Sequence, residues 1–349
     1  MKNKLLVWCS IILSFYIFCN HSVAESVKID CSLLPDGSVV IQFPDSFSET
    51  VREAYLYRST SDIDVIGVDS KYYPITKIHL TGEISDKGYR DAMVAANVRY
   101  FYQLEATLES GVKTISSRVS IQLPDTLLGI PANPEFHIDK TFYTLSVMDN
   151  GHLCKRYPIA LGRNPVDRKL HQDNATTPEG LYKILNLQPH ATFYKAYDIN
   201  YPNDCDRGRY ELAKHLHKLP KINDHYRSIG GEIQIHGMGI ESNWTFGCIA
   251  LRNADMDELF ACKTITTGIP VVITGNTITN DMLECMEKLK DRETVIRIQT
   301  RLKSLNYYTD IVDGKCGKKT FIAIGKFQSN KNLVVTCYPD AQTMKLLFQ

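Results

Sequence analysis

The sequence has 349 residues, enough for two or three domains at roughly 150 residues per domain. Hydrophobic residues make up 44% of it and charged residues 23%, a composition that excludes wholesale disorder. The 40 basic residues are balanced by 39 acidic ones, so the chain has no large basic field to hold a phosphate backbone. A nucleic-acid partner is therefore not expected.

Residues 1–24 have the pattern of a secretory signal peptide. Lys2 and Lys4 precede an apolar run over residues 5–18, and residues 22–24 (SVA) form a small-x-small cleavage site. The run is short for a bilayer-spanning helix, which needs about 20 apolar residues, so we prefer a cleaved signal over a retained anchor. We expect a periplasmic or otherwise extracytoplasmic protein with no membrane anchor after cleavage.

Cleavage would leave eight cysteines in the mature chain. They are Cys31, Cys154, Cys205, Cys248, Cys262, Cys285, Cys316 and Cys337. An oxidising compartment favours disulfides, and Cys316 and Cys337, which are close in sequence, are the first pair to test. No Cys-x-x-Cys occurs, and the His and Cys residues lack ligand-like spacing, so no metal site is predicted.

Residues 26–123 alternate between apolar and polar side chains, which predicts short antiparallel strands and a β-sandwich. The longest alternating row runs over residues 98–106 and is followed by a turn at Gly111. This part of the chain resembles the end of a fibronectin type III domain, with Tyr100 or Tyr102 in the region of the tyrosine corner. We interpret it as a spacer or docking module. Pro124, Pro131 and Pro134 then mark a stiff linker.

The last part of the chain, residues 294–349, has helical periodicity. Val295, Ile298, Leu302 and Leu305 recur at intervals of three and four, and a further short helix is predicted to start at Asp340. The order of residues 298–299 (IQ), 313–314 (DG), 320 (T) and 327–328 (FQ) resembles the small three-helix peptidoglycan-binding domain. A generic helical bundle is the alternative.

Residues 134–275 carry the chemistry. A strand over residues 233–235 ends at His236, and Gly237 allows the chain to turn sharply there. Eleven residues separate His236 from Cys248, which follows Gly247 and precedes an apolar strand. A thiol attacks a carbonyl as thiolate, and an imidazole within reach of a proton transfer supplies that form. We expect folding to bring the two side chains together, against the alternative of a buried structural cysteine.

Five ordered motifs in this segment resemble the L,D-transpeptidase (YkuD-type) catalytic domain. They are residues 161–165 (LGRNP), 177–180 (TPEG), 201–207 (YPNDCDR), 235–237 (IHG) and 244–253 (WTFGCIALRN). The resemblance implies a mainly-β fold and a cysteine acyltransferase acting on peptidoglycan stem peptides. It makes Cys248 the nucleophile and His236 the base, and it places the oxyanion amides at Gly247 and Cys248. The segment departs from the common signature at Phe246, where a second His is usual.

The prediction is thus a multidomain protein with a β-sandwich, an L,D-transpeptidase-like domain and a small three-helix domain. Further residues expected to bind substrate are Gly237, Trp244, Thr245, Arg252 and Asn253. The expected reaction needs no metal or organic cofactor and passes through a thioester on Cys248. The acyl acceptor is an amine of a neighbouring stem or of a wall-anchored protein. An L,D-carboxypeptidase or hydrolase, and a non-catalytic cell-wall-binding protein, are the alternatives.

Overall fold

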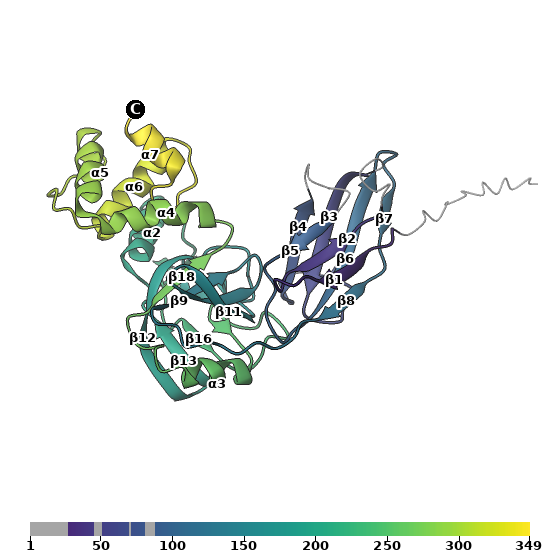
Figure 1. Cartoon of the computed structure of the whole chain (residues 1–349). Coiled ribbons are helices and arrows are strands. Elements are labelled where there is room, and N and C mark those ends of the chain that lie inside the picture. Colours follow the sequence, from purple (N-terminus) through teal and green to yellow (C-terminus); the bar gives the residue numbers. More distant parts are fainter. Residues whose placement is uncertain (1–26, 45–50, 70, 81–87) are drawn as a thin grey trace, which may run out of the picture.

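The computed structural model describes residues 27–44, 51–69, 71–80 and 88–349, so the predicted signal peptide lies outside the described residues. The described chain forms a β-rich N-terminal region, a central mixed sheet and a helical C-terminal region (Figure 1). Within these ranges, no helix combines the length and the apolar character needed to span a bilayer.

The N-terminal region consists of two antiparallel sheets that enclose one apolar core. The first sheet has the order β1 (Asp30–Leu33), β2 (Val39–Gln42), β5 (Tyr89–Asp91). The second contains β4 (Ile75–Leu80), β3 (Val51–Ser59), β6 (Arg99–Leu108) and β7 (Lys113–Ile115), with β8 (Val119–Gln122) also on β6. The Tyr100 hydroxyl accepts the Ala95 N–H at 2.9 Å, the backbone contact of a tyrosine corner. The predicted β-sandwich is confirmed, and its likeness to fibronectin type III domains stays a prediction.

The central region is built on an eight-stranded sheet. Its strands, in spatial order, are β11 (His152–Pro158), β10 (Thr144–Asp149), β9 (Pro134–Asp139), β18 (Pro270–Thr274), β12 (Gly180–Ala191), β13 (Tyr194–Ile199), β16 (Gln234–His236) and β17 (Ile249–Ala250). The pairs β9–β18 and β16–β17 are parallel and the others antiparallel. Helices α2 (Asp204–His215) and α3 (Asn253–Ala261) complete this region, together with the small hairpin of β14 (Lys221–Ile222) and β15 (His225–Tyr226). The predicted mainly-β character of this segment is confirmed.

The C-terminal region is helical, as the periodicity predicts. After the short α4 (Leu283–Glu287), the helices are α5 (Arg292–Ser304), α6 (Lys318–Asn330) and α7 (Ala341–Leu347). Helix α2 of the central region packs against α6, where a Cβ on Gly208 would lie 3.1 Å from the Cβ of Phe321. Cys205, Phe321 and Tyr338 share one buried cluster, so the two regions have a common core at this junction.

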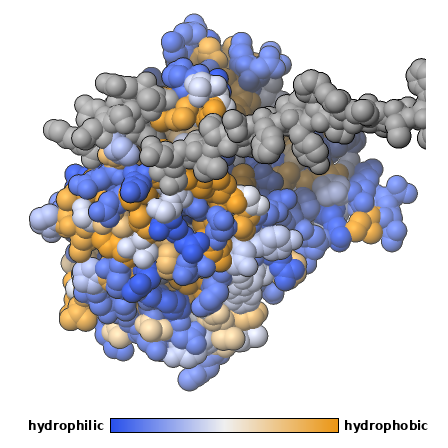
Figure 2. Space-filling view, turned by 90° about the vertical axis from the view of Figure 1, so that its right-hand side faces the viewer, coloured by the Kyte–Doolittle hydropathy of each residue, from blue (hydrophilic) through white to orange (hydrophobic). Residues whose placement is uncertain are grey.

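The sandwich also contacts the central region through buried charge. Arg58 is paired with Asp91 at 2.7 Å, and its guanidinium donates to the carbonyl oxygen of Phe142 at 2.5 Å. Figure 2, viewed from the side of the sandwich, shows hydrophobic side chains interspersed with hydrophilic ones. All eight cysteines among the described residues are free thiols, so Cys316 and Cys337, the pair to test first, form no disulfide in this structure.

Candidate active site

The signature histidine ends one strand, and the signature cysteine directly precedes the neighbouring strand, at one edge of the eight-stranded sheet. Strand β16 ends at His236, and β17 begins one residue after Cys248. The two strands are parallel, with Ile235 opposite Ile249. Both isoleucines are fully buried, and so are His236 and Ala250, so both faces of this strand pair are covered. Folding therefore places the two motifs side by side.

The His236 side chain is completely buried and lies between two aromatic rings. Phe193 stacks on the imidazole at 4.8 Å between centroids, and Trp244 meets it edge-on at 5.4 Å. Nδ1 lies 2.8 Å from the carbonyl oxygen of Gly237, which only accepts, so we assign the proton to Nδ1. Nε2 then has a free lone pair, with no hydrogen-bond partner among the described residues. Burial lowers the pKa of His236 and favours this neutral, basic form.

The thiol of Cys248 is partly exposed and is held by the backbone that leads into β16. Sγ accepts the N–H of Gln234 at 3.4 Å and donates to the carbonyl oxygen of Glu232 at 3.6 Å. Burial raises the pKa of this thiol, while the Gln234 N–H and the charge of Lys169 oppose the rise. No hydrogen bond joins the thiol to the His236 imidazole in this free form. The thiol must leave the Glu232 carbonyl before it can transfer its proton to that ring.

A tight turn before Cys248 is closed by the buried hydroxyl of Thr245. Its Oγ1 donates to the carbonyl oxygen of Cys248 at 2.7 Å and accepts the N–H of Gly247 at 3.1 Å. Gly247 has φ +131°, and a Cβ there would lie 2.5 Å from the carbonyl oxygen of Thr176, so the turn requires glycine. The Gly247 amide, an expected oxyanion donor, is thus already engaged by Thr245. The Cys248 amide makes no hydrogen bond to any residue in the described ranges.

Three of the residues expected to bind substrate lie around His236. A Cβ on Gly237 would lie 2.5 Å from Oδ1 of Asn253, which accepts the N–H of Met238 at 2.8 Å. Trp244 is partly exposed and packs on the imidazole, as described above. The contacts of Gly237 and Asn253 fix the turn that follows the histidine, and their contact with substrate remains a prediction.

Arg252 forms an ion pair with a nearby acid, and its expected contact with a substrate carboxylate remains a prediction. Its Nε and NH2 donate to the two carboxylate oxygens of Asp255 at 2.7 and 2.8 Å. Its NH1 donates to the carbonyl oxygen of Asn97 in the sandwich at 2.8 Å. Asp255 accepts two hydrogen bonds from one edge of the guanidinium, and Asn97 of the sandwich accepts one from NH1. Arg252 therefore positions α3 and the neighbouring region.

Lys169 is a neighbour of the nucleophile that the sequence did not single out. Its side chain is buried, and its amine donates to the carbonyl oxygens of Phe246 at 3.1 Å and Gln172 at 3.3 Å. The amine lies 3.2 Å from where a Cβ on Gly247 would sit. The only signal in the sequence was a lysine in the loop between the LGRNP and TPEG motifs. The side chain of Phe246, which replaces the usual second His, is 64% exposed.

No group of three His, Cys, Asp or Glu side chains suited to a metal ion is found in the part of the chain that the structure describes. A cavity of about 630 Å³ lies between α2 and the C-terminal helices, lined in part by Asn203, Arg207 and Tyr338. Its lining includes neither Cys248 nor His236, so it is separate from the pair described above.

Comparison with known proteins assigns two of the three regions. Residues 133–273 match the family model of the L,D-transpeptidase catalytic domain, YkuD. The "Putative L,D-transpeptidase YafK" of Escherichia coli K12 is 25% identical over 154 residues, which are 43% of this chain and 54% of the relative. The same protein of E. coli O157:H7 gives the same values. The chain spans about half the length of the curated relatives it matches.

Solved L,D-transpeptidases are also similar to this chain. That of Xylanimonas cellulosilytica DSM 15894 is 15% identical and covers 41% of this chain and 61% of its own, with a TM-score of 0.29. That of Mycobacterium smegmatis is 13% identical and covers 73% of this chain and 96% of its own, with a TM-score of 0.26. Because these TM-scores are low, the solved structures add nothing to the match with the family model.

The central region therefore matches the L,D-transpeptidase catalytic domain, a domain of enzymes, and has a mainly-β fold. The helical region that follows it matches the model described as "Putative peptidoglycan binding domain" over residues 291–347. The chain joins these two domains behind an N-terminal β-sandwich.

Proposed function

We propose that this protein is a cysteine acyltransferase that performs L,D-transpeptidation on peptidoglycan stem peptides. The observation that supports the proposal is the pairing of β16, which ends at His236, with β17, which follows Cys248 directly. Nε2 of the buried His236 has no hydrogen-bond partner among the described residues and can accept a proton. The match of residues 133–273 to the L,D-transpeptidase catalytic domain supports the same reaction.

The reaction starts with transfer of the Cys248 proton to Nε2 of His236. The resulting thiolate attacks the carbonyl that joins the third stem residue to D-Ala, and a new C–S bond forms as the carbonyl becomes an oxyanion. Collapse of this intermediate breaks the C–N bond, and the His236 imidazolium returns its proton to the leaving D-Ala amine. An acceptor amine then attacks the thioester, loses a proton to His236, and releases the cross-linked product as the thiol is restored.

The oxyanion needs a donor that is fixed before the reaction, and the Cys248 amide meets this requirement. It belongs to the nucleophile itself and has no partner among the described residues. Removing one such donor elsewhere costs about 10²–10³ in rate. Gly247 contributes the turn rather than its own amide, because Thr245 already accepts that N–H.

The flanking regions suit a wall-bound enzyme. We propose that residues 294–349 bind peptidoglycan, which raises the local concentration of stem peptides around residues 134–275. Residues 26–123 act as a docking module that holds the catalytic domain through Arg58 and Arg252. Secretion through a signal over residues 1–24 would deliver the protein to the wall outside the cytoplasm.

The test is mass analysis of purified muropeptides after incubation with the full mature chain. We expect wild type to yield cross-linked dimers and free D-Ala, and Cys248→Ala to yield neither. Cys285→Ala is the matched control, since Cys285 is also a partly exposed free thiol but lies in α4. Cross-linking by Cys248→Ala would overturn the proposal.

Two other outcomes identify the alternatives. Release of D-Ala without dimers would show that water resolves the thioester, as in an L,D-carboxypeptidase. Wall pelleting without turnover, and without a carbapenem adduct on Cys248, would show a non-catalytic wall-binding protein. Because a carbapenem adduct needs an active thiol and no acceptor, it separates a silent site from a missing acceptor.

A further inference from the structure

Three carboxamides and one carboxylate lie together on the sheet, on the strands next to Cys248. Asp198 of β13 is directly opposite Gln234 of β16 and Asn186 of β12, and Gln188 is two residues further along β12. Cross-strand partners share one face of a sheet. The residues that alternate with them on β13 and β16 belong to the apolar core: Tyr197, Ile199 and Ile235. The four polar side chains, here called the amide patch, therefore point away from that core.

The carboxylate of Asp198 accepts hydrogen bonds from all three carboxamides. Gln188 Nε2 lies 2.9 and 2.8 Å from its two oxygens, Gln234 Nε2 lies 2.7 Å from Oδ1, and Asn186 Nδ2 lies 3.2 Å from Oδ2. Because a carboxylate only accepts, each amide must turn its nitrogen toward it. The three amide oxygens have no hydrogen-bond partner among the described residues. The patch thus offers a ligand three amide oxygens around one carboxylate.

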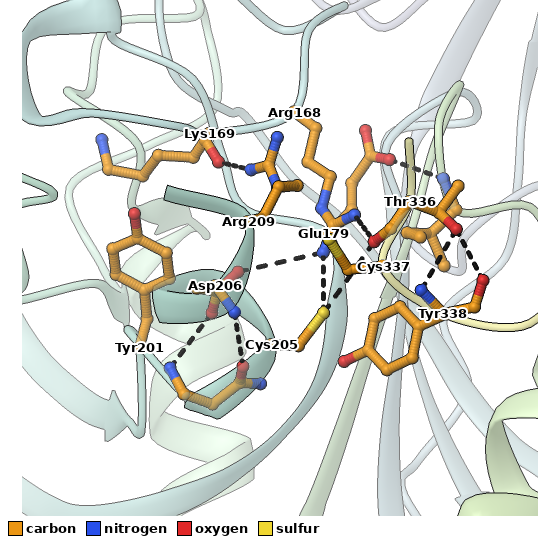
Figure 3. Close-up of polar contacts among 12 residues, drawn as sticks. Arg168, Lys169, Glu179, Tyr201, Cys205, Asp206, Arg209, Thr336, Cys337 and Tyr338 are labelled. Atoms are coloured by element: carbon orange, nitrogen blue, oxygen red, sulfur yellow. Dashed lines mark hydrogen bonds and ion pairs between the residues drawn. The ribbon is translucent and has the colours of Figure 1, made fainter. Parts of the chain in front are cut away.

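The negative charge of this patch has no cationic partner. Among the described residues, Asp198 forms no ion pair with a lysine, arginine or histidine, and its side chain is partly exposed. Other acids of the central region are paired: Asp206 lies 3.9 Å from Arg168 (Figure 3), and Glu179 lies 2.8 Å from Lys140. Neutral amides orient a carboxylate but leave its charge in place. An ammonium, with one positive charge and three N–H donors, complements such a site.

The amide patch is connected to the nucleophile through Gln234. The side chain of Gln234 donates to Asp198, while its backbone N–H lies 3.4 Å from Sγ of Cys248. Neighbouring strands are about 4.8 Å apart, so the backbones of Asp198 on β13 and of Cys248 beside β17 are separated by about 10 Å. Burial raises the pKa of the Cys248 thiol, and the charge of Asp198 adds to the rise. A ligand on the patch would therefore lie next to an acyl group on the sulfur.

We propose that the amide patch binds the ammonium group of the acyl acceptor, so that the second substrate is a cationic amine and not water. This inference rests on the proposed function, because it names the acceptor for the same thioester. The bound ammonium releases one proton to solvent, and the amine attacks the thioester carbonyl. A C–N bond forms, the C–S bond breaks, and the second proton passes through His236 to the sulfur of Cys248.

The kinetic test compares two acceptor probes with a stem peptide that ends in D-Ala as donor. Nα-acetyl-lysine amide is cationic at neutral pH, whereas hydroxylamine is uncharged. Loss of a hydrogen bond to a charged group weakens binding by about ten-fold, so Asp198→Asn should raise KM for the lysine probe by that factor and leave KM for hydroxylamine nearly unchanged. Asp224→Asn removes an exposed acid between β14 and β15 and should change neither value. Equal changes for both probes, or none in folded Asp198→Asn, would overturn the inference.

A binding measurement needs neither catalysis nor a change in the patch. Heteronuclear NMR of Cys248→Ala follows the side-chain NH2 signals of Asn186, Gln188 and Gln234. Nα-acetyl-lysine amide should shift these signals, and Nα,Nε-diacetyl-lysine amide, which lacks the charge, should not. The same shifts with both compounds, or with neither, would overturn the inference.

The two measurements separate this inference from the proposed function. Selective NMR shifts together with a wild type that releases no D-Ala would uphold the ammonium site and refute the proposed function. Cross-linking by wild type together with absent shifts would do the reverse.

Discussion

Replacing Thr245 with valine removes a hydroxyl that makes two hydrogen bonds and leaves the side-chain volume almost unchanged. The Gly247 N–H and the Cys248 carbonyl would both lose their partner inside a buried turn. Leaving a buried polar group without a partner costs about 1–3 kcal/mol, so we expect Thr245→Val to lose about 2–4 kcal/mol of the free energy of unfolding. Thr245→Ser keeps the hydroxyl and should recover most of the loss.

The assay is urea denaturation, monitored by tryptophan fluorescence. The chain has two tryptophans, and the removal of residues 1–24 leaves Trp244 alone, next to the substituted position. The emission therefore reports on this turn. A Thr245→Val variant with wild-type stability but a raised KM for stem peptide would refute the reasoning, because it would show that Thr245 contacts substrate rather than closing the turn.

Three further predictions concern the catalytic domain and its contacts. Arg252→Gln should leave KM for stem peptide unchanged and cost about 1–3 kcal/mol in urea denaturation, because buried Asp255 loses its partner. Burial holds the pKa of His236 in the folded protein below its ordinary value of 6.5. The unfolded chain therefore binds the extra proton, and the free energy of unfolding should fall as the pH drops below about 6.5. His236→Gln should weaken this pH dependence. Gly208→Leu should loosen the packing of α2 against Phe321 by about 1–3 kcal/mol, seen as faster proteolysis between the two domains.

Each of these has an outcome that contradicts it. A several-fold increase of KM in Arg252→Gln would restore the carboxylate-clamp interpretation. If the free energy of unfolding depends on pH equally in wild type and His236→Gln, groups other than His236 cause the loss of stability at low pH. Gly208→Ala adds only one carbon, and a larger effect from it than from the leucine variant would exclude overpacking as the cause.

The elements with strong periodicity were predictable from the sequence. The alternation over residues 98–106 lies in β6 apart from Val98, and the apolar face of residues 295–305 lies on α5 with Leu305 at its C-cap. The start of the last helix was also predictable, because the Asp340 side chain accepts the Thr343 N–H at 2.6 Å as an N-cap. In these cases, the local sequence contains the signal that the structure uses.

The surroundings of the nucleophile were less accessible to sequence reasoning. Cys248 and His236 could be placed by their motifs, but Lys169 reaches Phe246 across 77 positions of the chain, and no local pattern marks that contact. Arg252 stands close to the nucleophile in sequence, yet α3 begins beside it and turns its guanidinium toward Asp255. Contacts between residues far apart in the sequence determine where both side chains lie.

The carbonyl oxygen of Thr336 accepts a hydrogen bond at 2.8 Å from Arg168, the residue just before Lys169. That arginine is buried against Asp206 and Tyr338, and its acceptor lies in the segment between α6 and α7 of the C-terminal region. The C-terminal domain therefore cannot be replaced without regard to this hydrogen bond. Exchanging it for that of a distant relative would have to preserve this one backbone acceptor, or leave NH1 of the buried Arg168 without an acceptor next to Lys169 in the chain.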